Sequence, residues 1–367
     1  IQKMITERRY DIDWVRVIAI WLLMFYHLAI GFQPYGALIM FIQNNEFLKV
    51  LEIPMSMLSI WRIPILFFIS GMGVCFAMRK RDWKAFIGER SKRILLPFVF
   101  GFLTLVPLHQ MLWQSYFNQD IAYIPAPGHL WFLGNIFVYV LLLLPLFQYL
   151  KNKPDSKMSK WIRSTISSPF GLLIILAAFV AEAILVDPEM FALYALTPHG
   201  FWLGMIAFLF GYLTIYSGDA FWQMLKKIRW GLWMVTILLF LFRAFYFDLK
   251  TPNYLMGIES TFWILSIFAV GYTFLNKGSA TLTYLTQASY PIYILHMLFQ
   301  YLGSYFVFPL DIAPELKFII VLIFTFVGCY FIYEIIRRIN FLRPLFGLKL
   351  KSNERRIDEP IKAKYEL

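Results

Sequence analysis

Arg16 and His27 lie eleven residues apart in one apolar segment, and their types suit group transfer from a phosphate-bearing donor. At about 100° and about 1.5 Å per residue, that spacing in an α-helix returns to within roughly 20° of the same face, about 16 Å further along. A guanidinium binds phosphate, and an imidazole that titrates near neutral pH suits general-base work. The pair predicts a donor, such as one with a pantetheine arm, with its anionic head near Arg16 and its reactive end at His27.

The same spacing also fits a helix without a catalytic function. A snorkelling arginine at the membrane surface and a buried histidine bonded to a neighbour form the simpler arrangement, and spacing alone favours it. Asp13 lies one turn before Arg16 on the same helix and is predicted to pair with it.

A second group of cations strengthens the prediction of a donor site. In RKRDWKAFIGERSKRILLPF, Arg90 and Arg93 are three residues apart at the start of an apolar run, so they share a helix face. Guanidinium groups bind phosphates bidentately, although charges on the cytoplasmic side of a membrane protein need no such function. In the earlier run FFISG, Ser70 and Gly71, with Gly73 beyond them, allow close approach of a backbone or a thin ligand.

Further ionisable residues lie in apolar segments, where charges are costly and often functional. All five histidines of the chain are in such segments, which predicts a polar cavity that opens to the outer side. Capping or snorkelling near a helix end explains His199 and Glu259 equally well, and Glu182, Arg243 and His109 receive no role. The full set is Arg16, His27, Arg62, His109, His129, Glu182, His199, Arg243, Glu259, His296 and Glu334.

The composition excludes a soluble protein. Of the 367 residues, 60% are hydrophobic and 15% are charged, against about 45–50% and about 25% in average soluble domains. A soluble enzyme, a disordered chain and a secreted disulfide scaffold are therefore excluded. Cys75 and Cys329 both lie in apolar runs, so neither a disulfide framework nor a cysteine-based metal site is expected, and no metal is predicted.

Ten segments are long and apolar enough to span a membrane, since a spanning helix needs about 20 residues. No connection between them is long enough for a soluble domain. The chain is therefore predicted to be an all-α integral membrane protein, with a polytopic membrane domain at 1–337 and a basic cytoplasmic tail at 338–367. The predicted spans are 14–33, 55–78, 93–113, 129–150, 169–187, 198–216, 230–248, 258–275, 289–309 and 315–337.

The basic residues predict the orientation of these spans. Alternate connections hold most of the lysines and arginines, whereas the opposite loops hold only Lys49, Lys250 and, at a helix edge, Lys317. By the positive-inside rule both termini are cytoplasmic. The formal net charge of +12 is then mostly a signal of topology, and nucleic acid is not an expected partner.

Five stretches, in this order, resemble the membrane acyltransferase-3 family, and within it the glucan-succinylating branch (glucan biosynthesis protein C). The first holds Arg16 and His27, and the others hold Arg62, the Arg90–Arg93 pair, His129 with Trp131, and His296. They cover residues 8–150 and 289–296, and 151–288 matches mainly as a hydrophobic pattern. The stretches are YDIDWVRVIAIWLLMFYH, WRIPILFFISG, ERSKRILLPF, GHLWFLGNIFVYVLLL and SYPIYILH.

The resemblance implies a ten-helix enzyme of the bacterial inner membrane that takes an acetyl or succinyl group from cytoplasmic acyl-CoA. The acceptor would be a hydroxyl of an extracytoplasmic glucan or surface polysaccharide. His27 would be the essential histidine, with Arg16 and Arg62 at the catalytic site, and Arg90, Arg93 and Ser70 would bind the donor. His129, Trp131 and His296 would serve the acceptor. A homo-oligomer or a separate acceptor-handling protein is compatible with this family.

A transporter or exporter of a glycan or lipid-linked substrate is the main alternative. Ten helices with buried charges fit such a protein as well. A transporter does not need the Arg90–Arg93 pair or the register of Arg16 and His27, and the sequence shows no inverted repeat. The sequence does not distinguish the acyl group, the acceptor, the oligomeric state, or general-base from covalent catalysis.

Overall fold

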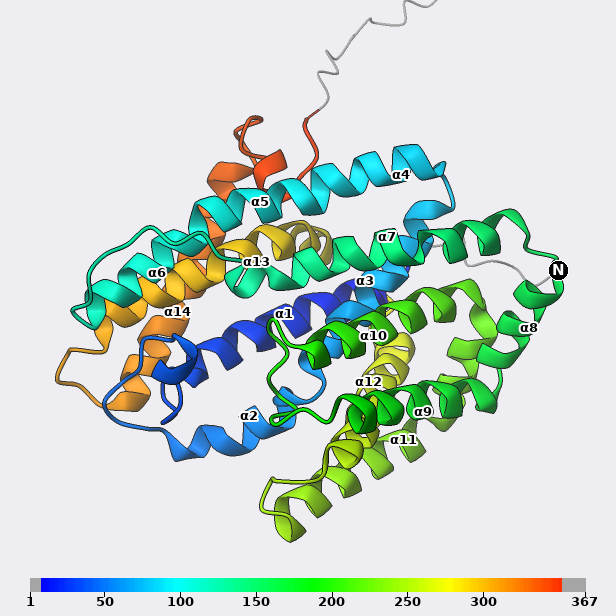
Figure 1. Cartoon of the computed structure of the whole chain (residues 1–367), viewed down its shortest axis with the longest axis horizontal. Coiled ribbons are helices and arrows are strands. Elements are labelled where there is room, and N and C mark those ends of the chain that lie inside the picture. Colours follow the sequence, from blue (N-terminus) through cyan, green and yellow to red (C-terminus); the bar gives the residue numbers. More distant parts are fainter. Residues whose placement is uncertain (1–7, 352–367) are drawn as a thin grey trace, which may run out of the picture.

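The computed structural model describes residues 8–351, and every regular element among them is a helix, as predicted. Figure 1 shows the helices packed side by side in one bundle, with α1 and α3 near its middle. The longer helices are α1 (Tyr10–Ile30), α3 (Arg62–Met78), α6 (Leu105–Tyr116), α7 (Trp131–Asn152), α9 (Pro169–Val186), α10 (Pro198–Tyr216), α11 (Asp219–Tyr246), α12 (Asn253–Phe274), α13 (Ala280–Val307) and α14 (Pro314–Ile336). The shorter ones are η1 (Ala37–Ile39), η2 (Lys49–Leu51), α2 (Glu52–Ser59), α4 (Trp83–Arg90), η3 (Ser91–Leu95), α5 (Leu96–Leu103), η4 (Gly128–Leu130), α8 (Lys157–Ile166) and η5 (Pro344–Phe346).

Nine helical stretches of the described chain are long and apolar enough to cross a membrane, one fewer than predicted. The predicted span that is missing, 289–309, belongs to α13. This helix has 28 residues and carries no Asp, Glu, Lys or Arg, so its lower hydropathy excludes it. Its polar residues include His296, Gln300 and Ser304, all three buried. The polar side of α13 therefore faces the interior of the bundle.

The central helix α3 packs very closely against α10. A Cβ at Gly71 would overlap the carbonyl oxygen of Phe208, and one at Gly211 would overlap the carbonyl oxygen of Phe68. The two backbones can approach only because glycine occupies both positions, as small residues permit in membrane proteins. Gly71 thus serves a helix contact, whereas a Cβ at Gly73 would have no neighbour within 4 Å.

A buried ion pair and a buried contact between a histidine and a carboxylate join helices in the half of the bundle formed by α9 to α12. Arg243 donates to Glu259 from Nε at 2.6 Å and from Nη2 at 3.1 Å, and its Nη2 also donates to the Ser56 carbonyl. His199 Nδ1 lies 2.9 Å from Glu182 Oε1, and both side chains are buried. These pairs give structural roles to four of the ionisable residues in apolar segments.

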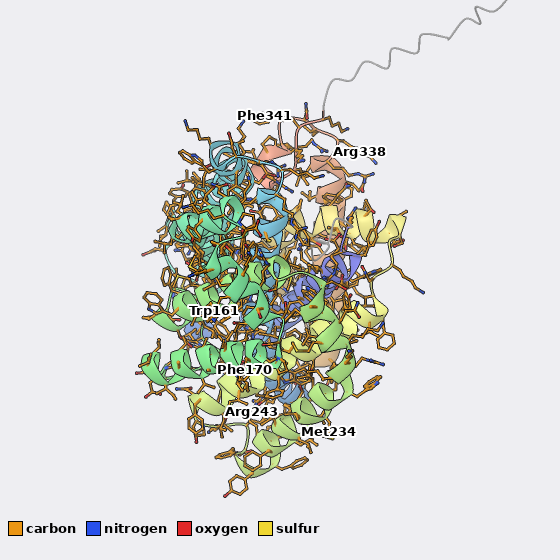
Figure 2. The ribbon with its side chains drawn as sticks, turned by 90° about the vertical axis from the view of Figure 1, so that its right-hand side faces the viewer. Trp161, Phe170, Met234, Arg243, Arg338 and Phe341 are labelled. Atoms are coloured by element: carbon orange, nitrogen blue, oxygen red, sulfur yellow. The ribbon has the colours of Figure 1, made fainter. Side chains whose placement is uncertain are left out.

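Removing one partner of the Arg243–Glu259 pair should destabilise the protein strongly. Arg243→Ala leaves the Glu259 carboxylate buried without its counter-charge, which costs about 3–5 kcal/mol. Arg338→Ala is a control, because that side chain is 74% exposed and pairs with Glu334 only at the surface. Figure 2 shows the two arginines far apart. In detergent, the midpoint temperature of thermal unfolding should decrease strongly for Arg243→Ala and hardly at all for Arg338→Ala. Equal decreases of this temperature in the two variants would contradict the structural role of the Arg243–Glu259 pair.

The segment after α14 folds back onto the bundle. Figure 2 shows Arg338 and Phe341 at the top of the view, close to the end of that helix. Phe346 in η5 packs edge-on against Phe100 of α5, with ring centroids 5.4 Å apart, and Gly347 accepts a hydrogen bond from Arg93. Residues 338–351 of the predicted tail therefore contact α5 and η3, which carries Arg93, and 352–367 lie outside the described residues.

Candidate active site

Four of the five histidines meet in one cluster. His27 of α1 lies with its Nδ1 2.9 Å from Nε2 of His296 in α13, and the planes of the two rings are 9° from parallel, with centroids 5.2 Å apart. His129 of η4 stands edge-on to His296 at 5.1 Å, and His109 of α6 lies 5.7 Å from His129. The structure thus brings together three residues selected from the sequence and adds His109, which was assigned no role.

Backbone carbonyls of α13 hold two rings of this histidine cluster. His296 Nδ1 lies 2.6 Å from the Tyr293 carbonyl oxygen, and His129 Nε2 lies 3.1 Å from the Ile294 carbonyl oxygen. The Tyr293 hydroxyl in turn donates to the His129 carbonyl. Because α13 supplies all of these partners, it fixes η4 and the two imidazoles as one unit.

His27 lines a small cavity within the described part of the chain. The cavity has a volume of about 10 Å³, and Phe41, Tyr301 and Ser304 are among its walls. A volume of about 10–15 Å³ accommodates one water. His27 is partly exposed, whereas His296 is completely buried. His27 is therefore the more accessible of the two rings.

Arg62 lies beside His27 with unused hydrogen-bonding capacity. Its guanidinium carbon is 3.3 Å from the ring centre of Tyr26, the residue before His27, and its charge acts on the His27 ring. Nη1 donates to the Ser59 carbonyl at 3.0 Å, but Nε is buried without a partner. A buried N–H without an acceptor is a donor available to a substrate oxygen.

Tyr194, in the connection between α9 and α10, supports the end of α2 near Arg62. Its hydroxyl donates to the Ile60 carbonyl at 3.0 Å. Burial raises the pKa of this phenol, so it remains protonated and keeps donating. No sequence pattern distinguishes Tyr194 from the other tyrosines, of which the chain has 21 in total.

The arginines predicted to bind the donor form a second cluster around Glu89. Its carboxylate lies 3.7 Å from Arg90, 3.3 Å from Arg93 and 3.6 Å from Arg81. Arg90 ends α4, and the π-helical turn η3 that follows carries Arg93. Such turns are frequent at functional sites. Three guanidinium groups around one carboxylate leave an excess of positive charge. The participation of Glu89 and Arg81 in this cluster is not predicted from the sequence.

Arg16 connects this arginine cluster to the histidine cluster along α1. Its Nη1 donates to Asp13 at 3.1 Å, the predicted pair, and its charge acts on that of Arg93. The Arg16 side chain is 31% exposed. Arg16, near the start of α1, is therefore within electrostatic range of Arg93, and His27 lies toward the other end of the same helix.

The side chains of Ser70 and Trp131 each contact their immediate neighbours. The Ser70 hydroxyl donates to the Leu66 carbonyl of its own helix at 2.8 Å, so it has no proton to offer a donor in this arrangement. Trp131 packs on Phe67 and Phe132, with centroid separations of 5.9 and 6.4 Å. In residues 8–351, no group of three or more His, Cys, Asp or Glu is arranged to hold a metal ion.

Residues 9–334 match a family model described as an acyltransferase domain, that of the acyltransferase-3 family. Both clusters lie within the matched region. Comparisons with curated proteins and with solved structures gave no match.

Proposed function

Because the chain belongs to the acyltransferase-3 family of membrane acyltransferases, we propose that it transfers an acyl group from cytoplasmic acyl-CoA to a carbohydrate hydroxyl on the opposite side. The observation that carries this proposal is that α1 bears Arg16 near its start, within electrostatic range of Arg93, and His27 near its other end. One helix thus connects an anion-binding site to a basic imidazole. The expected acyl group is acetyl or succinyl, and the expected acceptor is a glucan or surface polysaccharide.

The donor enters at the arginine cluster. CoA is polyanionic, and Arg16, Arg90 and Arg93 hold its phosphates by charge-assisted hydrogen bonds. The pantetheine arm follows α3, where Ser70, Gly73 and Ala77 share a partly exposed face. The end of this face is close to the arginines, because Arg81 donates to the Ala77 carbonyl at 3.3 Å. Since the cavity at His27 holds about one water, side chains must move when the acyl group arrives.

The reaction uses His27 as the base. One imidazole nitrogen of His27 takes the proton of the acceptor hydroxyl, and the hydroxyl oxygen bonds to the thioester carbonyl carbon. The C–S bond then breaks, and the departing CoA thiolate takes the proton from His27. Transient acylation of His27 gives the same products. The free Nε–H of Arg62 can donate to the oxyanion that develops on the carbonyl oxygen.

Placement in the membrane completes the proposal. The chain is a multi-pass membrane protein, and we place it in a bacterial inner membrane with both termini in the cytoplasm. This orientation puts the arginine cluster on the side that holds CoA and the histidine cluster toward the acceptor. A second copy of the chain or a separate protein that handles the acceptor is compatible with this arrangement.

Labelled acyl-CoA tests the function directly. Membranes that contain the protein are incubated with acetyl-CoA or succinyl-CoA carrying a labelled acyl group, and the label is followed into glycan. We expect transfer that membranes without the protein do not show. Thermal unfolding of the purified protein is measured in parallel with CoA. Absence of both label transfer and a thermal shift at millimolar CoA would favour a transporter.

Filling the open face of α3 should block the donor. Gly73→Leu places a side chain where a Cβ has no neighbour within 4 Å. We expect at least a tenfold decrease in transfer at limiting acyl-CoA. Gly231→Leu in α11 is the matched control, because a Cβ there also has no neighbour within 4 Å but lies away from this path. Leucine is the better helix former by about 1 kcal/mol, so neither change should break its helix; equal activities would contradict the path along α3.

A further inference from the structure

We propose that His296 is a positioning residue that fixes the tautomer of His27 and makes Nε2 of His27 the reactive nitrogen. This inference rests on the proposed function for its catalytic consequence. The tautomer assignment itself depends only on which atoms of the two rings face carbonyls and each other. It replaces the expectation that His296 contacts the acceptor, because that side chain is completely buried.

The proton of His296 is fixed by the backbone. Its Nδ1 lies 2.6 Å from the Tyr293 carbonyl oxygen, which can only accept a hydrogen bond. Nδ1 must therefore carry a hydrogen. In a neutral imidazole the other nitrogen is then unprotonated, so Nε2 of His296 is an acceptor.

Both rings are expected to be neutral at rest. His296 is completely buried, and none of the ion pairs among residues 8–351 involves a ring of the histidine cluster. A buried imidazolium without a counter-charge is costly. The neighbouring charge near His27 is that of Arg62, which opposes a second positive charge.

The proton of His27 follows from that of His296. The acceptor Nε2 of His296 lies 2.9 Å from Nδ1 of His27, so this nitrogen of His27 must be the donor. Nε2 of His27 is then the unprotonated, basic nitrogen. The arrangement has the logic of a catalytic triad, in which a third group orients the base, but a neutral histidine takes the place of the carboxylate.

This pair also accounts for the charge that forms during transfer. When Nε2 of His27 takes the hydroxyl proton, the ring becomes a cation and its Nδ1–H strengthens the bond to His296. The positive charge can be shared between the two rings, because the Nδ1 proton of His27 can move to Nε2 of His296. The Nδ1–H of His296 keeps its hydrogen bond to the Tyr293 carbonyl when this happens. The departing thiolate removes one proton and returns both rings to their neutral state.

Two substitutions of His296 separate positioning from packing. His296→Leu removes the acceptor, and His296→Gln keeps an amide oxygen that can accept the Nδ1–H of His27. We expect His296→Leu to lower kcat on the order of 10²-fold at unchanged KM for acyl-CoA, and His296→Gln to retain activity within about tenfold of the wild type. Phe308→Leu is the packing control, since its ring lies 4.9 Å from Phe32 at the ends of α13 and α1. It should lower thermal stability and leave kcat unchanged.

Nitrogen-15 NMR of the histidine-labelled protein tests the tautomer without any activity. The His27 signal, assigned from its loss in His27→Ala, should show a protonated Nδ1 in the wild type and a mixture or the Nε2–H form in His296→Leu. An Nε2–H form in the wild type, or equal kcat losses in folded His296→Gln and His296→Leu, would overturn the proposal. If the wild type transfers no acyl group but shows the Nδ1–H tautomer, the proposed function fails and the tautomer assignment stands.

Discussion

His27→Ala should abolish acyl transfer while the protein still inserts, folds and binds acyl-CoA. General-base catalysis contributes about 10²–10⁴-fold, and a covalent role would add to this, so we expect a decrease of at least about 10³-fold in kcat. Donor affinity should change little, because the arginine cluster lies at the other end of α1. Label transfer from acyl-CoA measures the first effect, and the CoA concentration that gives half of the thermal shift measures the second.

Ser289→Ala is the control for His27→Ala. This serine lies two turns before His296 on α13, and its hydroxyl donates to the Leu285 carbonyl of its own helix at 2.7 Å. Its removal should leave transfer unchanged. If His27→Ala forms product at a rate near the wild type, the base must be another group. A simultaneous loss of CoA binding would instead indicate that the substitution unfolds the protein.

The sequence predicted the helical class and the register of α1, because both depend on local periodicity. Arg16 and His27 are on one helix, so their relation follows from about 3.6 residues per turn. The convergence of the histidines could not be predicted in this way. His27, His109, His129 and His296 come from four segments, and only tertiary packing sets the distances between them.

The roles of the buried charges required knowledge of their partners. Arg243 and Glu259 are sixteen residues apart on two helices, and no spacing rule relates them. Glu89 is adjacent to Arg90 in sequence, yet its contact with Arg81 depends on the turn before α4. The small neighbours of Ser70 predict a close approach to α3, but not that its hydroxyl donates to the Leu66 carbonyl of its own helix.

The combined change Arg90→Gln and Arg93→Gln should raise the KM for acyl-CoA by about 10²-fold or more at nearly unchanged kcat. Hydrogen bonds to charged groups contribute about 1.5–3 kcal/mol each, and two of them correspond to at least that factor. The difference in KM between the variant and the wild type should become smaller as salt is added, because salt screens part of the attraction between the arginines and the CoA phosphates. Initial rates against acyl-CoA concentration, at low and high salt, measure both effects.

A loss of donor affinity could also follow from a lower total positive charge, so the control removes the same charge elsewhere. Lys157→Gln with Lys160→Gln takes two exposed cations from α8, in another predicted cytoplasmic segment, and should leave the KM unchanged. Dephospho-CoA thioesters, which lack the 3′-phosphate, should bind the wild type more weakly but lose little further affinity in the arginine variant. If the arginine variant loses as much affinity as the wild type when the 3′-phosphate is absent, this phosphate binds elsewhere. An unchanged KM for acyl-CoA would show that the arginine cluster does not bind the donor. The three guanidinium groups around Glu89 would then serve only the packing of α4 and η3.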